Sequence, residues 1–456
     1  MSKTIQSINP ATEEVIGTYD LANSPEIDQV LERSASAFRK WRRTPISERQ
    51  RPTRLLAAVL RAKKTELAKM ITSEMGKPIT EAEAEIEKCA WNCETYAEIG
   101  PRLLADKPAP SAASESYIQF LPLGPILAVM PWNFPFWQVF RFAAPTVMAG
   151  NTAVLKHASN VPGCSLNIAQ TFLDAGFPEG VFQSILVPGS AATRLIDDRR
   201  IAAVTLTGSN LAGSQVAAAA GAAIKKTVLE LGGSDPFIVL DDADLDAAVA
   251  TGVKSRFQNT GQSCIAAKRF IVVEKVFSSF AERFVAAVAA LKTGQPVERE
   301  TQVGPLARND LREGIEKQVA GSIALGATVL AGGCRLPGKG FFYAPTVLSE
   351  VASSFPAGCE EVFGPVAALM RVRDDEEAIA VANSSPFGLG SSLWTRDLDK
   401  ARRLAREIEA GQVFVNGMVA SDPRLPFGGI KESGYGRELS EFGIREFVNI
   451  QTVWIK

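Results

Sequence analysis

The sequence predicts an α/β protein whose parallel sheets are covered by helices on both faces. Short apolar runs typical of strands alternate with helical patterns along most of the chain, as expected for parallel strands joined by crossover helices. The chain has 456 residues, too many for one small core, and usual domain sizes suggest roughly two to four domains. The alternation is repeated in the second half, so we expect two α/β lobes that meet near Gly232-Gly233.

The first hundred residues differ from this pattern. We expect short strands within residues 4–20, around the Asn9-Pro10 turn, and helices over residues 24–100. Ser24-Pro25-Glu26 is a good helix start. Apolar residues then recur at helical spacing at Leu55, Leu56, Val59, Leu60 and Leu67.

The first lobe begins near Pro101, where the helical pattern ends in a proline-rich segment. Residues 116–130 are typical of a strand, a turn and a second strand, and the first of these strands is a candidate for an arm that reaches outside its domain. Helices are expected at 137–148, 162–175 and 211–224, and strands at 152–156, 182–186, 202–207 and 227–231.

The second lobe is predicted from the same two patterns. Strands are expected at 236–240, 269–273, 366–372, 391–395 and 413–416, and helices at 244–257, 277–291, 376–383 and 398–408. A last strand at 446–455 could pair with the early arm or with another subunit.

The amino-acid composition indicates which kind of ligand the protein binds. A formal net charge of −1 gives no electrostatic footprint for nucleic acid or for an anionic membrane. No stretch reaches the ~18 uninterrupted apolar residues of a membrane span, and the first residues lack signal-peptide and transit-peptide patterns. We therefore expect a cytoplasmic protein that acts on a small molecule.

Cys264 is the strongest candidate nucleophile. It stands in a short polar turn that contains Gly261, before the strand at 269–273, so its thiol should be reachable. His157 is the single histidine and would have to serve any Cys–His pair, Ser–His–Asp triad or multi-histidine metal site. The proton acceptor for Cys264 is therefore expected to be a carboxylate, such as Glu230, a lysine or water, and no metal site is expected.

A possible phosphate site follows the strand that ends at Thr207. Gly208-Ser209-Asn210 leads into a helix, and a helix N-terminus offers free N–H groups and the positive end of a dipole. The spacing is not the dinucleotide fingerprint GxGxxG, and a turn of this kind is more often only a connection.

Six motifs taken together resemble the aldehyde dehydrogenase superfamily. In chain order they are Pro131-Trp-Asn-Phe-Pro135, Thr207-Gly-Ser209, Glu230-Leu-Gly-Gly233, Gly261-Gln-Ser-Cys264, Glu361-Val-Phe-Gly-Pro365 and Pro426-Phe-Gly-Gly429. The resemblance implies a Rossmann-like cofactor domain (residues 1–107 and 123–232), a catalytic domain (233–432) and a small β arm (108–122 and 433–456) through which a homodimer or homotetramer forms.

The resemblance also implies a mechanism. Cys264 would attack an aldehyde to give a thiohemiacetal, which loses a hydride to a nicotinamide and becomes a thioester that water, activated by Glu230, hydrolyses. The side-chain amide of Asn133 and the backbone N–H of Cys264 would stabilise the oxyanion.

The cofactor site is inferred in the same way. The family pattern assigns Lys156 to the adenosine ribose and the residues around Ser209 to the pyrophosphate. The full set of residues implied is Trp132, Lys156, Ser159, Gly208, Ser209, Leu231, Glu361 and Phe363. Relatives that prefer NAD commonly carry a glutamate where Ser159 stands, and serine with Lys156 could instead bind a 2′-phosphate. NADP is favoured, and NAD stays open.

The expected substrate pocket contains Trp137, Arg141, Gln258 and Ser421. Trp137 and Arg141 lie one helical turn apart and share a face. Arg141 lies in an apolar helix and must meet an anion, which would be either a substrate carboxylate or the partner in a structural salt bridge. Within the superfamily the chain is similar to members that oxidise succinate semialdehyde, and Arg256 could contribute.

Three other functions are compatible with the same residues. The chain could oxidise short aldehydes without regard to a carboxylate, with Arg141 structural. It could pass its thioester to coenzyme A, although Glu230 supplies a base for water instead. It could also be a noncatalytic binding protein that kept the fold, which the presence of Cys264, Glu230 and Asn133 argues against.

Overall fold

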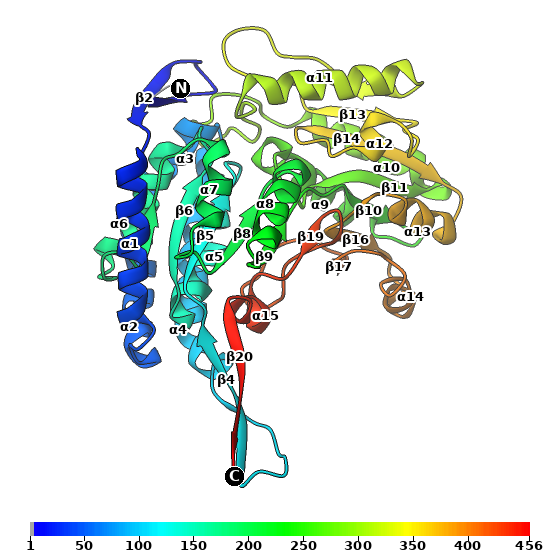
Figure 1. Ribbon diagram of the computed structural model, residues 1–456. Helices are drawn as coiled ribbons and strands as arrows, with labels where there is room; N and C mark the ends of the chain where they lie inside the picture. The colour runs from blue at the N-terminus through cyan, green and yellow to red at the C-terminus, as the bar shows by residue number, and fades with distance from the viewer. Residues whose placement is uncertain (1–3) are drawn as a thin grey trace.

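The computed structural model describes residues 4–456 and confirms the α/β class. Figure 1 shows two lobes, each built on its own sheet, and a narrow β arm that extends below them. The sheets have six and seven strands. None of the helices described in residues 4–456 combines the length and the hydropathy needed to span a bilayer.

The sheet of the first lobe is parallel except at one edge. Its order is β19-β9-β8-β5-β6-β7, with β5 (Pro125–Met130), β6 (Thr152–His157), β7 (Phe182–Ser184), β8 (Ala203–Thr207), β9 (Lys226–Glu230) and the antiparallel β19 (Gly434–Tyr435). The chain moves from β5 to β6 on one side and later adds β8 on the other. The order therefore reverses at β5, and the carboxyl ends of β5, β6 and β8 border the crevice where such sheets bind ligands.

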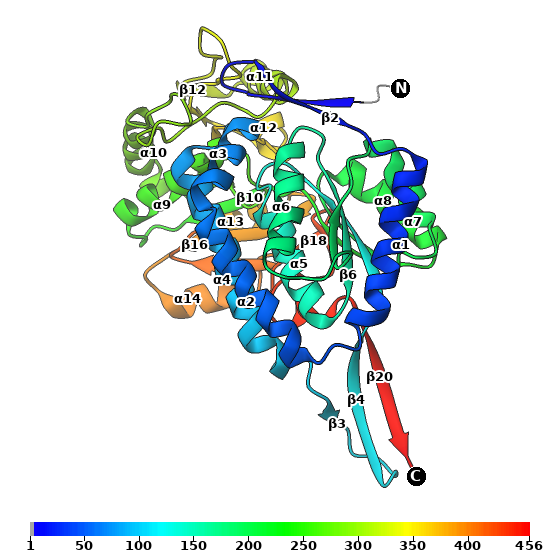
Figure 2. The same ribbon diagram turned by 90° about the vertical axis from the view of Figure 1, so that its left-hand side faces the viewer.

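Helices cover both faces of this sheet, because neighbouring strand residues point to opposite sides. Ile126 and Ala128 of β5 pack with α2 (Ile46–Ala62), α3 (Lys64–Met75), α4 (Ile79–Leu103), α5 (Trp137–Ala149) and α6 (Pro162–Asp174). Leu127 packs with α1 (Ser24–Trp41), α7 (Ala192–Asp197) and α8 (Asn210–Ala222). Figure 2 shows these two groups of helices on either side of the strands.

The sheet of the second lobe follows the same rule. Its order is β12-β13-β14-β11-β10-β16-β17, with β12 (Thr328–Ala331), β13 (Thr346–Ser349), β14 (Val366–Val372), β11 (Ala267–Val273), β10 (Asp235–Val239), β16 (Gly390–Trp394) and β17 (Gln412–Val415), and only β12 runs antiparallel to its neighbour. One face packs on α9 (Leu245–Phe257) and α10 (Glu274–Ala289), and the other on α11 (Asn309–Ala324), α13 (Asp375–Asn383) and α14 (Leu398–Leu404).

Most differences from the prediction are at element ends. The helix expected to reach residue 408 ends at Leu404, because the N–H groups of Arg406 and Glu407 bond to carbonyls three residues back in a tighter turn. The sequence did not predict β12, β13, α7, α11 or the short α12 (Pro356–Cys359). Smaller elements are β1 (Thr4–Ile8), β2 (Val15–Asp20), β15 (Phe387–Gly388), β18 (Ile430–Lys431) and α15 (Ser440–Arg445).

The arm consists of β4 (Glu115–Pro122) and β20 (Val448–Ile455), with β3 (Lys107–Pro108) beside β4. Strands β4 and β20 pair antiparallel, with Val448 opposite Pro122 at one end and Ile455 opposite Glu115 at the other. The last strand therefore pairs with the early arm, which was one of the two partners left open. The exact domain boundaries remain a prediction.

Candidate active site

The loop that carries Cys264 is a strained turn fixed by hydrogen bonds. Asn259, Thr260 and Gly261 have φ of 54°, 56° and 71°, and left-handed backbone is uncommon for residues with a side chain. Glu81 of α4 accepts the Asn259 N–H at 2.7 Å. The Asn259 side chain donates to the Asn133 carbonyl at 2.7 Å. The turn is thus held from two directions in the conformation that presents Cys264.

Lys268 holds the same loop from below. It is the second residue of β11, is fully buried, and donates to the carbonyls of Ser263 at 2.9 Å and Cys264 at 2.7 Å. Its Nζ lies 3.6 Å from Glu361. The sequence motifs do not indicate this residue, although a lysine inside a buried parallel strand must find such partners.

Arg256 also supports the loop and does not line the substrate pocket. Its guanidinium is buried and donates to the carbonyls of Gly261 at 2.7 Å and Gly364 at 2.5 Å. The suggestion that it could contribute to the substrate site is therefore wrong, because its terminal nitrogens bond to backbone carbonyls and its side chain lies outside the pocket lining.

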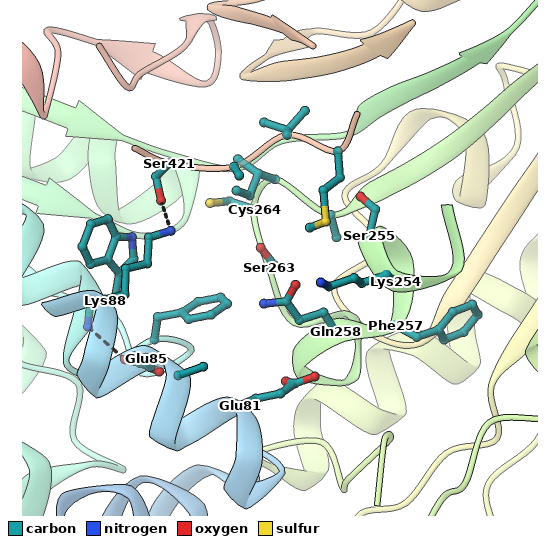
Figure 3. A pocket seen from close by; sticks show the side chains of 18 of the residues that line it. Glu81, Glu85, Lys88, Lys254, Ser255, Phe257, Gln258, Ser263, Cys264 and Ser421 are labelled. Atoms are coloured by element: carbon teal, nitrogen blue, oxygen red, sulfur yellow. Dashed lines mark hydrogen bonds between the residues drawn. The ribbon is translucent and has the colours of Figure 1, made fainter. Parts of the chain in front are cut away.

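A pocket of about 800 Å³ opens over Cys264 and contains the four residues expected to bind substrate. Trp137 and Arg141 enter from α5, Gln258 from the end of α9, and Ser421 from the loop after β17. Figure 3 shows Cys264, Gln258 and Ser421 around this space. Burial raises the pKa of the Cys264 thiol to about 12, although Arg141 and Lys268 pull it down, so the thiol is protonated at neutral pH.

Arg141 has a protein carboxylate as its partner. It forms an ion pair with Glu438, and both side chains are almost completely buried. Its guanidinium also lies 4.2 Å from the centre of the Phe427 ring and 3.4 Å from the Thr207 hydroxyl. The structural salt bridge that the sequence left open for Arg141 is present, although the side chain still borders the pocket.

Glu230 ends β9 outside the pocket lining. Its carboxyl packs against Gly428, where a Cβ would lie only 2.7 Å from Oε1. Among residues 4–456 neither carboxyl oxygen has a hydrogen-bond partner. Burial holds the pKa well above its usual range and Glu438 raises it further, while Arg141 opposes both. The group is therefore a desolvated carboxyl that holds its proton more tightly than an ordinary glutamate does.

The loop after β5 carries Asn133 toward the nucleophile. The Asn133 amide donates to the Gln262 carbonyl at 3.2 Å, which leaves its second N–H for a ligand. His157 holds the other end of this loop: Nε2 lies 2.9 Å from the Pro135 carbonyl, and Nδ1 lies 2.9 Å from the Ala158 N–H and 3.2 Å from the Met130 carbonyl. Burial lowers the pKa of His157 to about 4, which keeps the ring neutral.

The residues expected to hold the cofactor gather at the crevice where the first sheet reverses its order. Lys156 lies at the end of β6, and burial lowers its pKa. The exposed Ser159 follows β6, and the Gly208-Ser209 turn leads from β8 into α8. An ammonium, a hydroxyl and a helix N-terminus suit the phosphates of a dinucleotide.

The other expected cofactor residues lie toward Cys264. The rings of Trp132 and Phe363 meet edge to face with centroids 5.8 Å apart. Glu361 accepts the Gly233 N–H at 3.0 Å. Leu231 is buried and packs so closely on Gly213 that a Cβ there would lie 2.5 Å from it.

Lys88 is a pocket residue that the sequence analysis missed. It lines the pocket from α4, and its Nζ donates to the Ser421 hydroxyl at 2.7 Å, a bond drawn in Figure 3. The available signal was the helical spacing of Glu81, Glu85 and Lys88, which places three charges on one face of a mostly buried helix.

The chain is similar to known aldehyde dehydrogenases over almost its whole length. Residues 1–453 match the model of the aldehyde dehydrogenase family. The chain is 52% identical over 454 residues to succinate-semialdehyde dehydrogenase [NADP(+)] 1 of Mycobacterium tuberculosis, covering 99% of both proteins. It is 52% identical over 448 residues to succinate semialdehyde dehydrogenase [NAD(P)+] Sad of Escherichia coli, covering 98% of this chain and 97% of that one.

A solved structure shares the whole fold. The succinic semialdehyde dehydrogenase of Streptococcus pyogenes, in complex with NADP+, superposes with a TM-score of 0.97 at 38% identity and covers 99% of both chains.

Proposed function

The chain belongs to the aldehyde dehydrogenase family, and on that basis we propose that it oxidises succinate semialdehyde to succinate with NADP as the preferred cofactor. The observation that supports this most directly is the pocket itself. It places a cysteine among Lys88, Arg141 and Ser421, so a small aldehyde with an anionic end suits both its chemistry and its charge.

Cys264 acts as the nucleophile in the proposed reaction. Its sulfur bonds to the aldehyde carbon, and the oxygen that becomes negative is met by the free N–H of the Asn133 amide. The cofactor, when bound, supplies the acceptor for the hydride. Because burial raises the pKa of Cys264, the thiolate forms only when a base or the bound ligands favour it.

Hydrolysis of the thioester is assigned to Glu230. A carboxyl with a raised pKa is a strong base once it loses its proton, so it suits the activation of water. Arg141 opposes the raised pKa and thereby favours the carboxylate. This role also distinguishes the proposed enzyme from a relative that passes its acyl group to coenzyme A.

Lys156 and Ser159 are proposed to select NADP. The carboxylate that would repel a 2′-phosphate is replaced by the exposed Ser159, near the Lys156 ammonium at the end of β6. The Escherichia coli relative is named for both cofactors, which supports NAD as a weaker alternative here.

We propose that the arm joins subunits of a homodimer or homotetramer. We also propose that the enzyme is cytoplasmic. Ile450, Trp454 and Ile455 expose apolar surface on β20, which is an edge strand of the β20-β4-β3 sheet, and an edge strand is suited to further pairing.

Initial rates of reduced-cofactor formation test the proposal. Succinate semialdehyde and butanal are compared, each with NADP and with NAD. The proposal expects the highest kcat/KM for succinate semialdehyde with NADP. Equal kcat/KM for the two aldehydes would instead support the broad-specificity alternative, and turnover that required coenzyme A would support the acyltransferase alternative.

A further inference from the structure

Lys88 is a cation of the Cys264 pocket. Its Nζ donates to Ser421 Oγ at 2.7 Å and lies 4.5 Å from the centre of the Trp137 ring. Within residues 4–456 it forms no ion pair. Burial of the group, followed by the charge of Arg141, lowers its pKa to about 8.

The acidic side chains around Lys88 already bind other groups of the protein. Glu85, one helical turn away, pairs with the buried Lys77 and accepts the N–H groups of Phe136 at 2.8 Å and Trp137 at 2.9 Å.

Asp422, next to Ser421, binds Arg424 through both carboxylate oxygens, at 2.9 and 2.6 Å. Glu438 is paired with Arg141. A partly buried ammonium that lines a pocket and lacks a protein counter-ion favours an anion supplied from the pocket.

We propose that Lys88, together with Ser421, binds the carboxylate of the substrate and so determines specificity, an inference that rests on the proposed function. Ser421 accepts its hydrogen bond from Lys88, so its own hydroxyl hydrogen is free to donate to a carboxylate oxygen. Lys88 keeps further N–H donors for the same group. Arg141 adds positive potential but has its ion pair with Glu438.

Kinetics of two Lys88 variants test this assignment. Lys88→Met keeps the stem that packs on Trp137, and Lys88→Gln keeps a donor for Ser421, but neither has the charge. Lys254→Met is the matched control, because Lys254 lines the same pocket from α9 with an exposed side chain. The values of kcat and KM are measured for succinate semialdehyde, glutarate semialdehyde and butanal at saturating NADP.

Both Lys88 variants are expected to lose at least about 30-fold in kcat/KM for succinate semialdehyde, mainly through KM, since truncating a buried charge partner is costly. Butanal kinetics and the selectivity of Lys254→Met should stay near wild type. Unchanged selectivity in the Lys88 variants would overturn the proposal. Loss of butanal turnover in both would do so too, because it would assign Lys88 a structural role.

The same panel separates this inference from the proposed function. If wild type prefers glutarate semialdehyde to succinate semialdehyde and the Lys88 variants lose that preference, the named substrate fails and the role of Lys88 stands. If wild type prefers no carboxylated aldehyde over butanal, both are overturned.

Discussion

Arg141 and Glu438 form a buried ion pair beside the pocket that contains Cys264. The pair joins α5 to the segment between β19 and α15, and it lies close enough to Glu230 for both of its members to shift the pKa of that carboxyl. The positive charge of Arg141 is therefore part of the scaffold and part of the electrostatics of the site.

Removing one member of this pair should destabilise the protein. Arg141→Met leaves Glu438 buried without a counter-ion, and we expect the free energy of unfolding to fall by about 3 kcal/mol. Chemical denaturation measures the change. The double variant Arg141→Met with Glu438→Gln should recover part of the loss, and a single variant as stable as wild type would contradict the role of the pair.

Lys268 should control the position of the nucleophile. Lys268→Met removes the donors to the Ser263 and Cys264 carbonyls, and we expect kcat to fall by about 100-fold, because small displacements of a reacting group are costly. Lys275→Met is the control, since Lys275 pairs with Asp241 on the surface. Steady-state rates decide, and equal rates in the two variants would show that the loop does not depend on Lys268.

His157 should make stability depend on pH. Its folded pKa of about 4 lies below the unfolded value, so the unfolded chain binds the proton more readily and stability is lost as pH falls through this interval. Between pH 7.5 and 5 we expect a loss of about 2 kcal/mol from this residue.

The matched comparison for this prediction is His157→Gln, which should lack that part of the pH dependence in denaturation experiments. Since His157 is the single histidine, its imidazole proton resonances also report it directly. A midpoint near pH 6.5 in the folded protein would contradict the buried neutral ring.

Ser159 should set the choice of cofactor. Ser159→Glu places a negative charge where we propose the 2′-phosphate binds, and KM for NADP should rise at least about tenfold while KM for NAD rises little, because like charges repel. Ser159→Gln has the same length without the charge and serves as the control. A glutamate variant that kept its preference for NADP would place the 2′-phosphate elsewhere.

The sequence predicted the local features of this protein best. The alternation of strands and helices located both sheets, and the pattern around Cys264 and Gly208-Ser209 located the loops at their ends. These features depend on neighbouring residues and on regular periods, which a single sequence displays directly.

Contacts between distant segments could not be predicted in this way. The pairing of Arg141 with Glu438, and of Lys88 with Ser421, depends on how α4, α5 and the C-terminal segment pack together. Arg141 was recognised as a charge in need of an anion, but no local pattern indicates whether that anion belongs to the protein or to the substrate. Lys88 was missed because a lysine on a helix is usually solvated.

In the proposed reaction Cys264 carries the acyl group until Glu230 activates water. The most direct test is the mass of the Glu230→Gln variant after it reacts with succinate semialdehyde and NADP, followed by peptide mapping. We predict a succinyl adduct on Cys264 that persists in this variant and is absent from wild type after turnover. An unmodified Cys264, or an adduct on another residue, would contradict the mechanism.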